Sequence, residues 1–419
     1  MNEDRRQRPA RFHYGFVILL ISLLIISGTL GFARFGYTMI LPSMKEGLAL
    51  SYTEMGMLAT GNFVGYLIFA LVGGFLAARY GPRLIISLSM LLVGTTMLLT
   101  GLAPAFPFAL AMRILTGIGS GGSNVPVMGL LSSWFAPRRR GMATGLVVGG
   151  SGVGLVITGP LVPAIIAAYS PDGWRYSWYY LGLAVIVIAL LGYVLLRNRP
   201  AEKGLSPIGA AESSTSNPAQ RAASSLQWGL VYKSKTLWHL AVIYFMFGFS
   251  YIIYATFFAA YLTKEGGMTA QAAGSLWAMI GVISIVSGLL WGTVSDLVGR
   301  KKGLAMVYAL QGLSFLVFAV VKSTSGFYVS AFLFGLTAWS IPAIMAAACG
   351  DYLGARLAPA ALGLITVIFG IGQAIGPSAA GRIADVTASF SLAFLAAAVA
   401  AFAGAVGSLL LKPSATQAD

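Results

Sequence analysis

The sequence predicts an all-α membrane protein with twelve transmembrane helices in two pseudo-symmetric six-helix bundles. Apolar residues make up 58% of the 419 positions and charged residues only 9%, whereas soluble domains carry about 25% charged residues. Segments of roughly 20 apolar residues, the length needed to cross a bilayer core about 30 Å thick, recur along the chain. A pattern of glycines in the first half returns in the second. These observations exclude a soluble globular protein.

Apolar runs between Gly, Pro and charged residues predict the twelve spans. They lie near residues 14–42, 53–78, 84–103, 106–135, 142–168, 177–196, 237–262, 270–295, 303–321, 325–353, 359–383 and 388–411. Residues 200–235 are rich in Ser, Ala, Pro and Gln and contain no apolar run, which is typical of a solvated linker. We therefore expect an N-terminal bundle over residues 1–199, a cytoplasmic linker over 200–235 and a C-terminal bundle over 236–419.

Basic residues are unevenly distributed among the predicted loops. With a cytoplasmic N-terminus, twenty of the 27 Lys and Arg residues lie on the cytoplasmic side and five on the outer side, so both termini are predicted to be cytoplasmic. The net charge of +15 lies in these short loops rather than on one basic face, which argues against nucleic-acid binding. The first apolar run exceeds the length of a signal peptide, so we expect a retained helix. The single cysteine, Cys349, excludes an intrachain disulfide.

A fixed offset of 218 residues relates the two halves. The matched pairs are Gly74 and Gly292, Gly81 and Gly299, Gly117 and Gly335, Gly145 and Gly363, Gly152 and Gly370, Gly154 and Gly372, and, after a one-residue slip, Gly159-Pro160 and Gly376-Pro377. Glycine is frequent, with 52 residues, but the matched order makes chance a poor explanation. Two related halves around a central site are a recurrent transporter architecture.

The repeated segments resemble the Gly-xxx-Asp-Arg-x-Gly-Arg-Arg loop of the major facilitator superfamily, and the likeness covers nearly the whole chain. In that family the Asp and the basic residues latch neighbouring helices at their cytoplasmic ends. The resemblance therefore implies gating or structural roles for Gly74, Arg79, Gly81, Arg83, Asp296, Gly299 and Arg300. The second half keeps the acid as Asp296, whereas the first half has Ala78, so the first-half latch departs from the family pattern.

Further stretches narrow the branch. Residues Phe12 to Ile18 and Trp134 to Gly145 resemble bacterial monocarboxylate and oxalate:formate-type carriers, and Ala33 to Tyr37 and Tyr251 to Thr256 resemble the YbfB-type branch. The resemblance implies a multi-pass protein of the bacterial inner membrane that acts as a monomer without a cofactor.

Two arginines fall inside predicted spans, Arg34 in span 1 and Arg113 in span 4. Each buried charge costs at least about 2.5 kcal/mol, so both require a function. Their counterparts at the 218 offset are Ile252 and Ala331, and no acid lies at the same depth. The pair predicts a positive cavity for an anion, bound by planar bidentate donors. For Arg113 the family's span-4 motif, Arg-xxx-Gly-x-Gly, implies an alternative, a bond to the backbone of helix 1.

Polar and aromatic residues on the cavity helices form a second set of substrate-binding candidates. They are Tyr37, Thr38, Asn62, Tyr66, Asn124, Tyr251, Tyr254, Trp339 and Gln373. The alternative for each is helix packing or an interfacial aromatic belt.

Glycine and proline in span 5 carry a separate signal. Gly149 to Pro160 resembles a motif of exporting antiporters, and Gly159-Pro160 and Gly376-Pro377 are expected to serve either flexure or close helix packing. The run Gly117 to Gly122 matches G-x-G-x-x-G, but it lies within an apolar span rather than after a strand, so nucleotide binding is rejected.

These features predict a secondary transporter for a small organic anion, a monocarboxylate, working by alternating access with proton symport or exchange for a counter-anion. Efflux of amphiphilic drugs or metabolites is the alternative, suggested by the span-5 motif. A sensor on a carrier scaffold would need an appended domain, and the sequence shows none between or after the bundles. No nucleophile with a base and no metal-ligand cluster lies in the spans, so we expect neither an enzyme nor a metal site. The expected partners are the anion, a proton or counter-anion, and membrane lipid.

Overall fold

The computed structural model describes residues 13–210 and 232–411, and almost all of them are helical. Ten helices are long and apolar enough to cross a membrane, and an eleventh span, Tyr52–Ala70 with Val72–Tyr80, is bent by 44°. A twelfth helix of spanning length, α5 (Phe106–Trp134), contains Arg, Gly, Ser and Asn residues and is less apolar than these spans. The prediction of an all-α membrane protein is confirmed, and the twelve helices agree with the predicted spans.

Each half contains six spans, and two spans in the first half are composed of consecutive helical pieces. In the first half these are α1 (Gly15–Ile26), η1 (Ser27–Phe35) and α2 (Gly36–Gly47) as span 1; α3 (Tyr52–Tyr80); α4 (Pro82–Gly101); α5; α6 (Pro137–Val148) and α7 (Gly150–Ala168) as span 5; and α8 (Gly173–Leu195). In the second half they are α10 (Lys235–Lys264), α11 (Ala270–Val298), α12 (Arg300–Val320), α13 (Thr324–Thr337) with the first part of α14 (Ser340–Thr387), the rest of α14, and α15 (Ser391–Leu409). Gly354, at φ 76°, separates the last two spans within α14.

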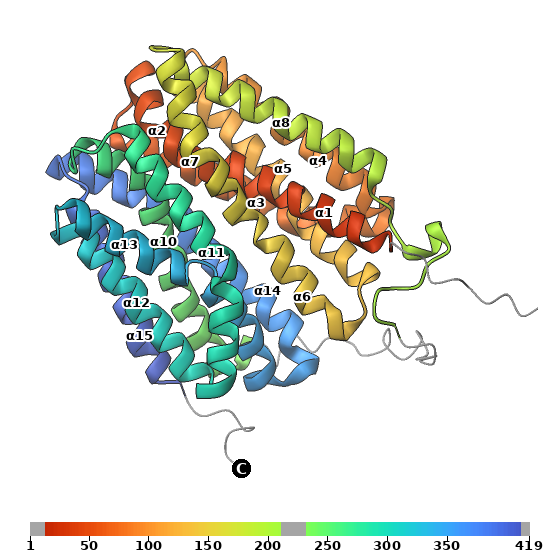
Figure 1. Cartoon of the computed structure of the whole chain (residues 1–419). Helices are drawn as coiled ribbons and strands as arrows, with labels where there is room; N and C mark the ends of the chain where they lie inside the picture. The colour runs from red at the N-terminus through yellow and green to blue at the C-terminus, as the bar shows by residue number, and fades with distance from the viewer. Residues whose placement is uncertain (1–12, 211–231, 412–419) are drawn as a thin grey trace, which may run out of the picture.

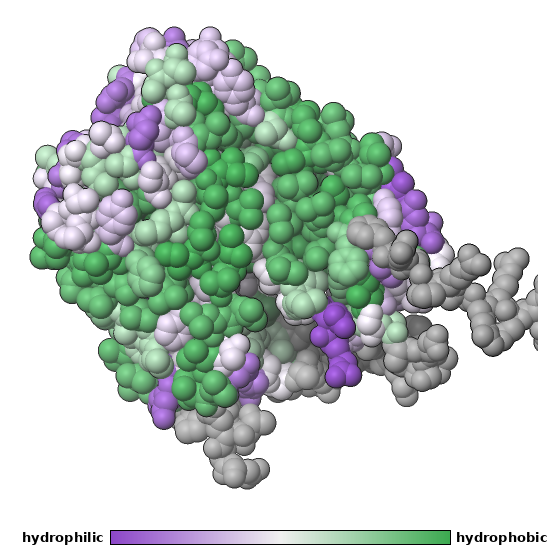
Figure 2. Space-filling view, in the orientation of Figure 1, coloured by the Kyte–Doolittle hydropathy of each residue, from purple (hydrophilic) through white to green (hydrophobic). Residues whose placement is uncertain are grey.

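The two halves lie side by side, with the N-terminal helices across the top and right of Figure 1 and the C-terminal helices at its lower left. Hydrophobic side chains cover the middle of the surface, and hydrophilic ones gather towards its two ends (Figure 2). This belt is what a bilayer requires, since hydrocarbon accepts apolar side chains and helices with satisfied backbones.

The matched glycines of the repeat make matched turns. Gly81 has φ 90° and ends α3, and Gly299 has φ 88° and ends α11. Both angles lie in the region that favours glycine, so the two half-loops turn in the same way. The repeat therefore reflects a shared backbone geometry at these positions.

The halves touch mainly at one end of the bundle. We call the end where α1 begins and α15 ends the termini end, and the opposite end the far end. In the described chain, the hydrogen bonds between the two halves all lie towards the far end. They include Thr60 Oγ1 to Ala374 O at 2.6 Å and the bonds of Tyr52 and Thr53 to Asp385. Towards the termini end, side chains added at the matched Gly145 and Gly363 would meet no atom within 4 Å. The molecule is closed at the far end.

The beginning of the predicted linker packs on the N-terminal half. A short 3-10 helix covers Pro200–Lys203, and Ile208 forms an isolated bridge with Phe135. The side chain of His13 hydrogen-bonds the carbonyl of Ser206 at 3.0 Å. Residues 211–231 of the predicted linker lie outside the described residues, and its last residue, Lys235, already begins α10.

Candidate functional site

Arg34 lies on an irregular segment of span 1. Residues Ser27–Phe35 form a π-helix between two α-helical pieces, a feature that is often found at functional sites. Two contacts with α7 hold this segment: Ser27 Oγ donates to Gly150 O at 2.8 Å, and Gly31 packs so closely on Gly154 that an added Cβ would lie 2.5 Å from its Cα. Because neither Gly31 nor Gly154 has a side chain, the π-helix can lie directly on span 5.

The guanidinium of Arg34 has aromatic neighbours but no hydrogen-bond acceptor. Its Cζ lies 4.6 Å from the ring centre of Phe63 and 4.5 Å from that of Tyr66. The side chain is only 9% exposed, and its buried Nε and Nη2 atoms have no hydrogen-bond partner in the described chain. These two N–H groups share one edge of the guanidinium, the edge that binds a carboxylate bidentately. Arg34 therefore presents an unused fork of donors.

Arg113, in contrast, is held by backbone carbonyls. Its Nη1 donates to Ala33 O at 2.6 Å and its Nε to Leu58 O at 3.4 Å. The Cζ lies 4.6 Å from the ring centre of Tyr37 and 5.3 Å from that of Trp178. This geometry matches the alternative in which the span-4 arginine bonds the backbone of helix 1.

Aromatic and amide side chains continue the site into the second half. Phe35 packs on Trp339, with ring centres 5.3 Å apart, and Trp339 meets Tyr251 edge-on at 6.3 Å. Gln373 donates to the Tyr251 hydroxyl. In the first half Asn124 donates to the Tyr66 hydroxyl at 3.1 Å. The structure thus brings six predicted residues into one region, the central site: Arg34, Tyr66, Asn124, Tyr251, Trp339 and Gln373.

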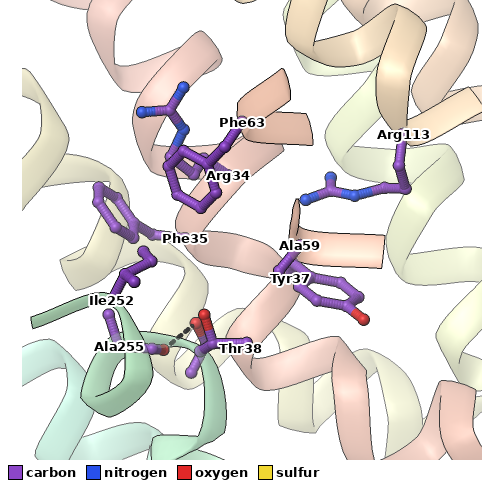
Figure 3. Close-up of a pocket in the computed structure, with 10 residues that line it drawn as sticks. Arg34, Phe35, Tyr37, Thr38, Ala59, Phe63, Arg113, Ile252 and Ala255 are labelled. Atoms are coloured by element: carbon purple, nitrogen blue, oxygen red, sulfur yellow. Dashed lines mark hydrogen bonds between the residues drawn. The ribbon is translucent and has the colours of Figure 1, made fainter. Parts of the chain in front are cut away.

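Other predicted residues have contacts that bind helices together. Tyr37 donates to Met55 O at 2.8 Å, and Asn62 donates to Arg113 O at 3.3 Å. Thr38 donates to Ala255 O across the two halves at 2.6 Å (Figure 3). Tyr254 lies in the core of the C-terminal half, fully buried among phenylalanines and 2.9 Å from Ser330 Oγ. The structure does not place Tyr254 at the central site.

Both arginines border one small void between the halves. Its volume is about 10 Å³, and its lining includes Arg34, Tyr37 and Arg113 from the first half and Ile252 and Thr256 from the second. In Figure 3 the Arg34 guanidinium points away from the side of the pocket where Arg113 and Tyr37 lie. A space of this size holds about one water molecule, so a substrate requires the halves to separate here.

The loop motif differs between the halves, as the sequence suggests. In the second half Arg300 contacts Asp296 and donates from Nε to Asp351 at 2.7 Å, which joins α11, α12 and α14. The positions 218 residues earlier are Pro82, Ala78 and Ser133, and all three border a cavity of about 670 Å³. The C-terminal half therefore has an ionic latch where the N-terminal half has a cavity.

The other motif residues lie at turns and helix contacts. Arg83 donates from Nε to Tyr193 O at 2.7 Å, and the exposed Arg79 stacks on Tyr80 with Cζ 5.4 Å from the ring centre. Gly159 meets Gly274 of the other half, where an added Cβ would lie 2.4 Å from the carbonyl oxygen. Gly376 packs on the carbonyl oxygen of Phe249, and the carbonyl oxygen of Pro377 packs on Gly56. Pro160 is exposed, and Gly74 lies near Val125. Gly159 and Gly376 thus lie at close helix contacts, where an added side chain would collide with backbone atoms.

Sequence reasoning missed Phe35 and Phe63 and two breaks in helical geometry. The π-helix carries Arg34 and Phe35, and the gap between α13 and α14 carries Trp339, whose backbone N–H donates to Ser287 Oγ at 3.2 Å. Both phenylalanines lie within spans rich in aromatic residues, so no local pattern distinguishes them. The two breaks meet where Phe35 contacts Trp339. Transporters commonly form their binding sites from interrupted helices of this kind.

The chemistry of the site is that of binding. Its side chains are donors and aromatic rings, and among the described residues no three His, Cys, Asp or Glu side chains group as a metal site would require. Two six-helix halves around a central cationic site define a major facilitator-type transporter.

Comparisons with known proteins give the same class and a family. The family model described as "Uncharacterised MFS-type transporter YbfB" matches residues 26–408. The chain belongs to this family, so it is a multi-pass membrane transporter and not an enzyme.

Similar proteins span nearly its whole length. It is 26% identical to the hexuronate transporter of Bacillus subtilis over 96% of this chain and 97% of that protein. It is 24% identical to a probable sulfoacetate transporter of Cupriavidus necator over 90% of this chain and 89% of that protein. It is also 24% identical to a putative tartrate transporter of Agrobacterium vitis over 93% of this chain and 92% of that protein. In fold it resembles a bacterial homologue of the human lysosomal transporter Spinster, in an inward-facing and unoccupied conformation, with a TM-score of 0.74, 17% identity and 95% of both chains covered.

Proposed function

We propose that this transporter carries a small organic anion, a monocarboxylate, and that Arg34 binds its carboxylate. The observation that supports this most directly is the buried, unpartnered Nε–Nη2 edge of Arg34. A buried charge without a partner is unfavourable, and an anionic ligand supplies one. No carboxylate touches the guanidinium in the described chain, which favours anions and disfavours organic cations.

The names of the relatives agree with such cargo. Hexuronate, sulfoacetate and tartrate are all organic anions with at least one carboxylate. Since identity is only 24–26%, these names support the chemical class rather than a particular compound.

The proposed transport cycle is alternating access of the two halves around the central site. We take the termini end as cytoplasmic, because the basic residues Arg138, Arg139 and Lys302 lie there, in the first turns of α6 and α12. The conformation closed at the far end is then the inward-facing one. The side chains that contact Arg34 include no acid to relay a proton, which leaves anion exchange or symport of a proton bound to the substrate itself.

A ligand screen on the purified transporter tests this function. Small monocarboxylates should raise its melting temperature in detergent, and lipophilic cations should not. The reverse pattern would instead support efflux of amphiphilic compounds. Counterflow in proteoliposomes, with and without a pH gradient, then separates anion exchange from proton symport.

A further inference from the structure

The first turn of α3 is capped by both halves of the molecule. Its own residues form a capping box, in which Ser51 Oγ accepts from Glu54 N at 3.1 Å and Glu54 accepts from Ser51 N at 2.8 Å. The other two free N–H groups, on Tyr52 and Thr53, donate to the carboxylate of Asp385, each at 2.8 Å. Asp385 belongs to α14 of the opposite half. A helix begins with four unsatisfied N–H groups, and here the second half supplies the acceptors for two of them.

More contacts join the halves at the same place. The hydroxyl of Thr53 donates to Asp385 Oδ2 at 2.5 Å. Lys264 of α10 contacts the Tyr52 hydroxyl and lies 4.3 Å from its ring centre, and the Phe390 ring packs edge-on at 4.9 Å. Tyr52 and Thr53 are therefore held by α10, by α14 and by the residue that precedes α15.

In the part of the chain that the structure describes, this arrangement has no equivalent on the other side of the pseudo-symmetry axis. The counterpart of the α3 start is the start of α11, whose cap is its own Thr269, accepting from Ala272 N at 3.2 Å. Beyond the one-residue slip of the repeat, the position that corresponds to Asp385 is Ala168, which offers no acceptor side chain. Among the described residues, the shared helix cap thus occurs on one side of the far-end contact.

We propose that Asp385, Thr53, Tyr52 and Lys264 form a clasp that holds the far end closed and must release each time the transporter opens there. Separation of the halves breaks all of the clasp bonds together, because one carboxylate makes three of them. The capping box of Ser51 and Glu54 lies within one half, so it preserves the helix start after release. The clasp sets the balance between the two access states and takes no part in substrate binding.

The test measures distances by double electron–electron resonance between spin labels. In a Cys349→Ser background, which removes the single native cysteine, one label pair is placed at the exposed far-end positions Glu46 and Thr324. A second pair is placed at the exposed termini-end positions Arg138 and Lys302. Asp385→Ala should raise the ratio of far-end-open to far-end-closed molecules about five- to thirty-fold, the effect of losing a few hydrogen bonds. The far-end pair should move apart as the termini-end pair approaches.

Two comparisons make the result decisive. The neighbouring, 71% exposed Val386 makes none of the clasp contacts, so Val386→Ala should leave both distance distributions unchanged. Adding Thr53→Ala to Asp385→Ala should produce little further shift, because the one clasp bond of the Thr53 side chain is already lost when Asp385 is replaced. Asp385→Asn keeps one acceptor oxygen and should give an intermediate shift. This variant replaces Asp385→Ala in the test if Asp385→Ala does not fold. Distributions in the Asp385 variants that match those of Val386→Ala, or additive shifts with Thr53→Ala, would overturn the proposal.

Discussion

Nη1 of Arg113 donates a 2.6 Å hydrogen bond to the carbonyl oxygen of Ala33, the residue that precedes Arg34. One intramembrane arginine is thereby attached to the backbone of the segment that carries the other. On the proposed function, Arg113 stabilises the π-helix through this bond, and Arg34, whose Nε and Nη2 have no partner in the described chain, binds the anion. The two arginines should therefore respond differently to substitution.

Substitution by methionine should separate the two roles. Arg113→Met leaves the Ala33 carbonyl without its donor in a buried site, which should lower the stability by about 2–4 kcal/mol. Arg34→Met removes an unpaired buried charge and should leave the melting temperature unchanged or raised. Thermal unfolding in detergent without ligand checks this, and equal losses for the two variants would contradict the division of roles.

The aromatic ring of Tyr66 should matter more than its hydroxyl for the position of Arg34. Tyr66→Phe keeps the ring beneath the guanidinium, whereas Tyr66→Ala removes a cation–π contact worth about 1–2 kcal/mol when it is desolvated. The affinity for a carboxylate ligand should fall several-fold in Tyr66→Ala and much less in Tyr66→Phe. Ligand titration by thermal shift gives both values, and a larger loss in Tyr66→Phe would refute the cation–π role.

Two glycines of the repeat should differ sharply in their tolerance of a side chain. A Cβ on Gly159 would lie 2.4 Å from the Gly274 carbonyl oxygen, so Gly159→Ala should destabilise the closed far end by about 1–3 kcal/mol. Gly145 has free space, and Gly145→Ala should be neutral or stabilising by up to about 1 kcal/mol. Melting temperatures of the two variants distinguish packing from flexure, since a hinge role alone predicts no such contrast.

The Arg300 latch should contribute modestly to stability, because its carboxylates are partly exposed. Asp296 and Asp351 are 62% and 39% accessible, and exposed ion pairs contribute about 1 kcal/mol or less. Arg300→Gln should lower the melting temperature slightly, and high salt should reduce the difference. Lys302→Gln, at an exposed position in the first turn of α12, serves as the control. An equal effect of both substitutions would exclude a specific latch.

Much of the fold could be predicted from the sequence because a bilayer imposes strong rules. Span length, loop charge and the glycine repeat led to twelve helices, and Arg34 was found because charge is rare in membrane spans. The roles of Arg113 and Tyr254 required coordinates, since helical periodicity does not tell a cavity-facing side chain from one that binds a neighbouring helix. The π-helix at Ser27–Phe35 and the shared cap at Asp385 were also missed, because both depend on contacts between distant segments.

Arg34 as the anion anchor is tested most directly by calorimetric titration of a carboxylate ligand into purified wild-type, Arg34→Lys and Arg34→Ala proteins, with Lys302→Gln as the matched control. Charge-assisted hydrogen bonds contribute about 1.5–3 kcal/mol. Arg34→Lys, which keeps the charge and loses the fork, should therefore bind at least about tenfold more weakly. Binding should be undetectable in Arg34→Ala and unchanged in Lys302→Gln. Wild-type affinity in a folded Arg34→Ala protein would contradict the assignment of Arg34 as the anchor.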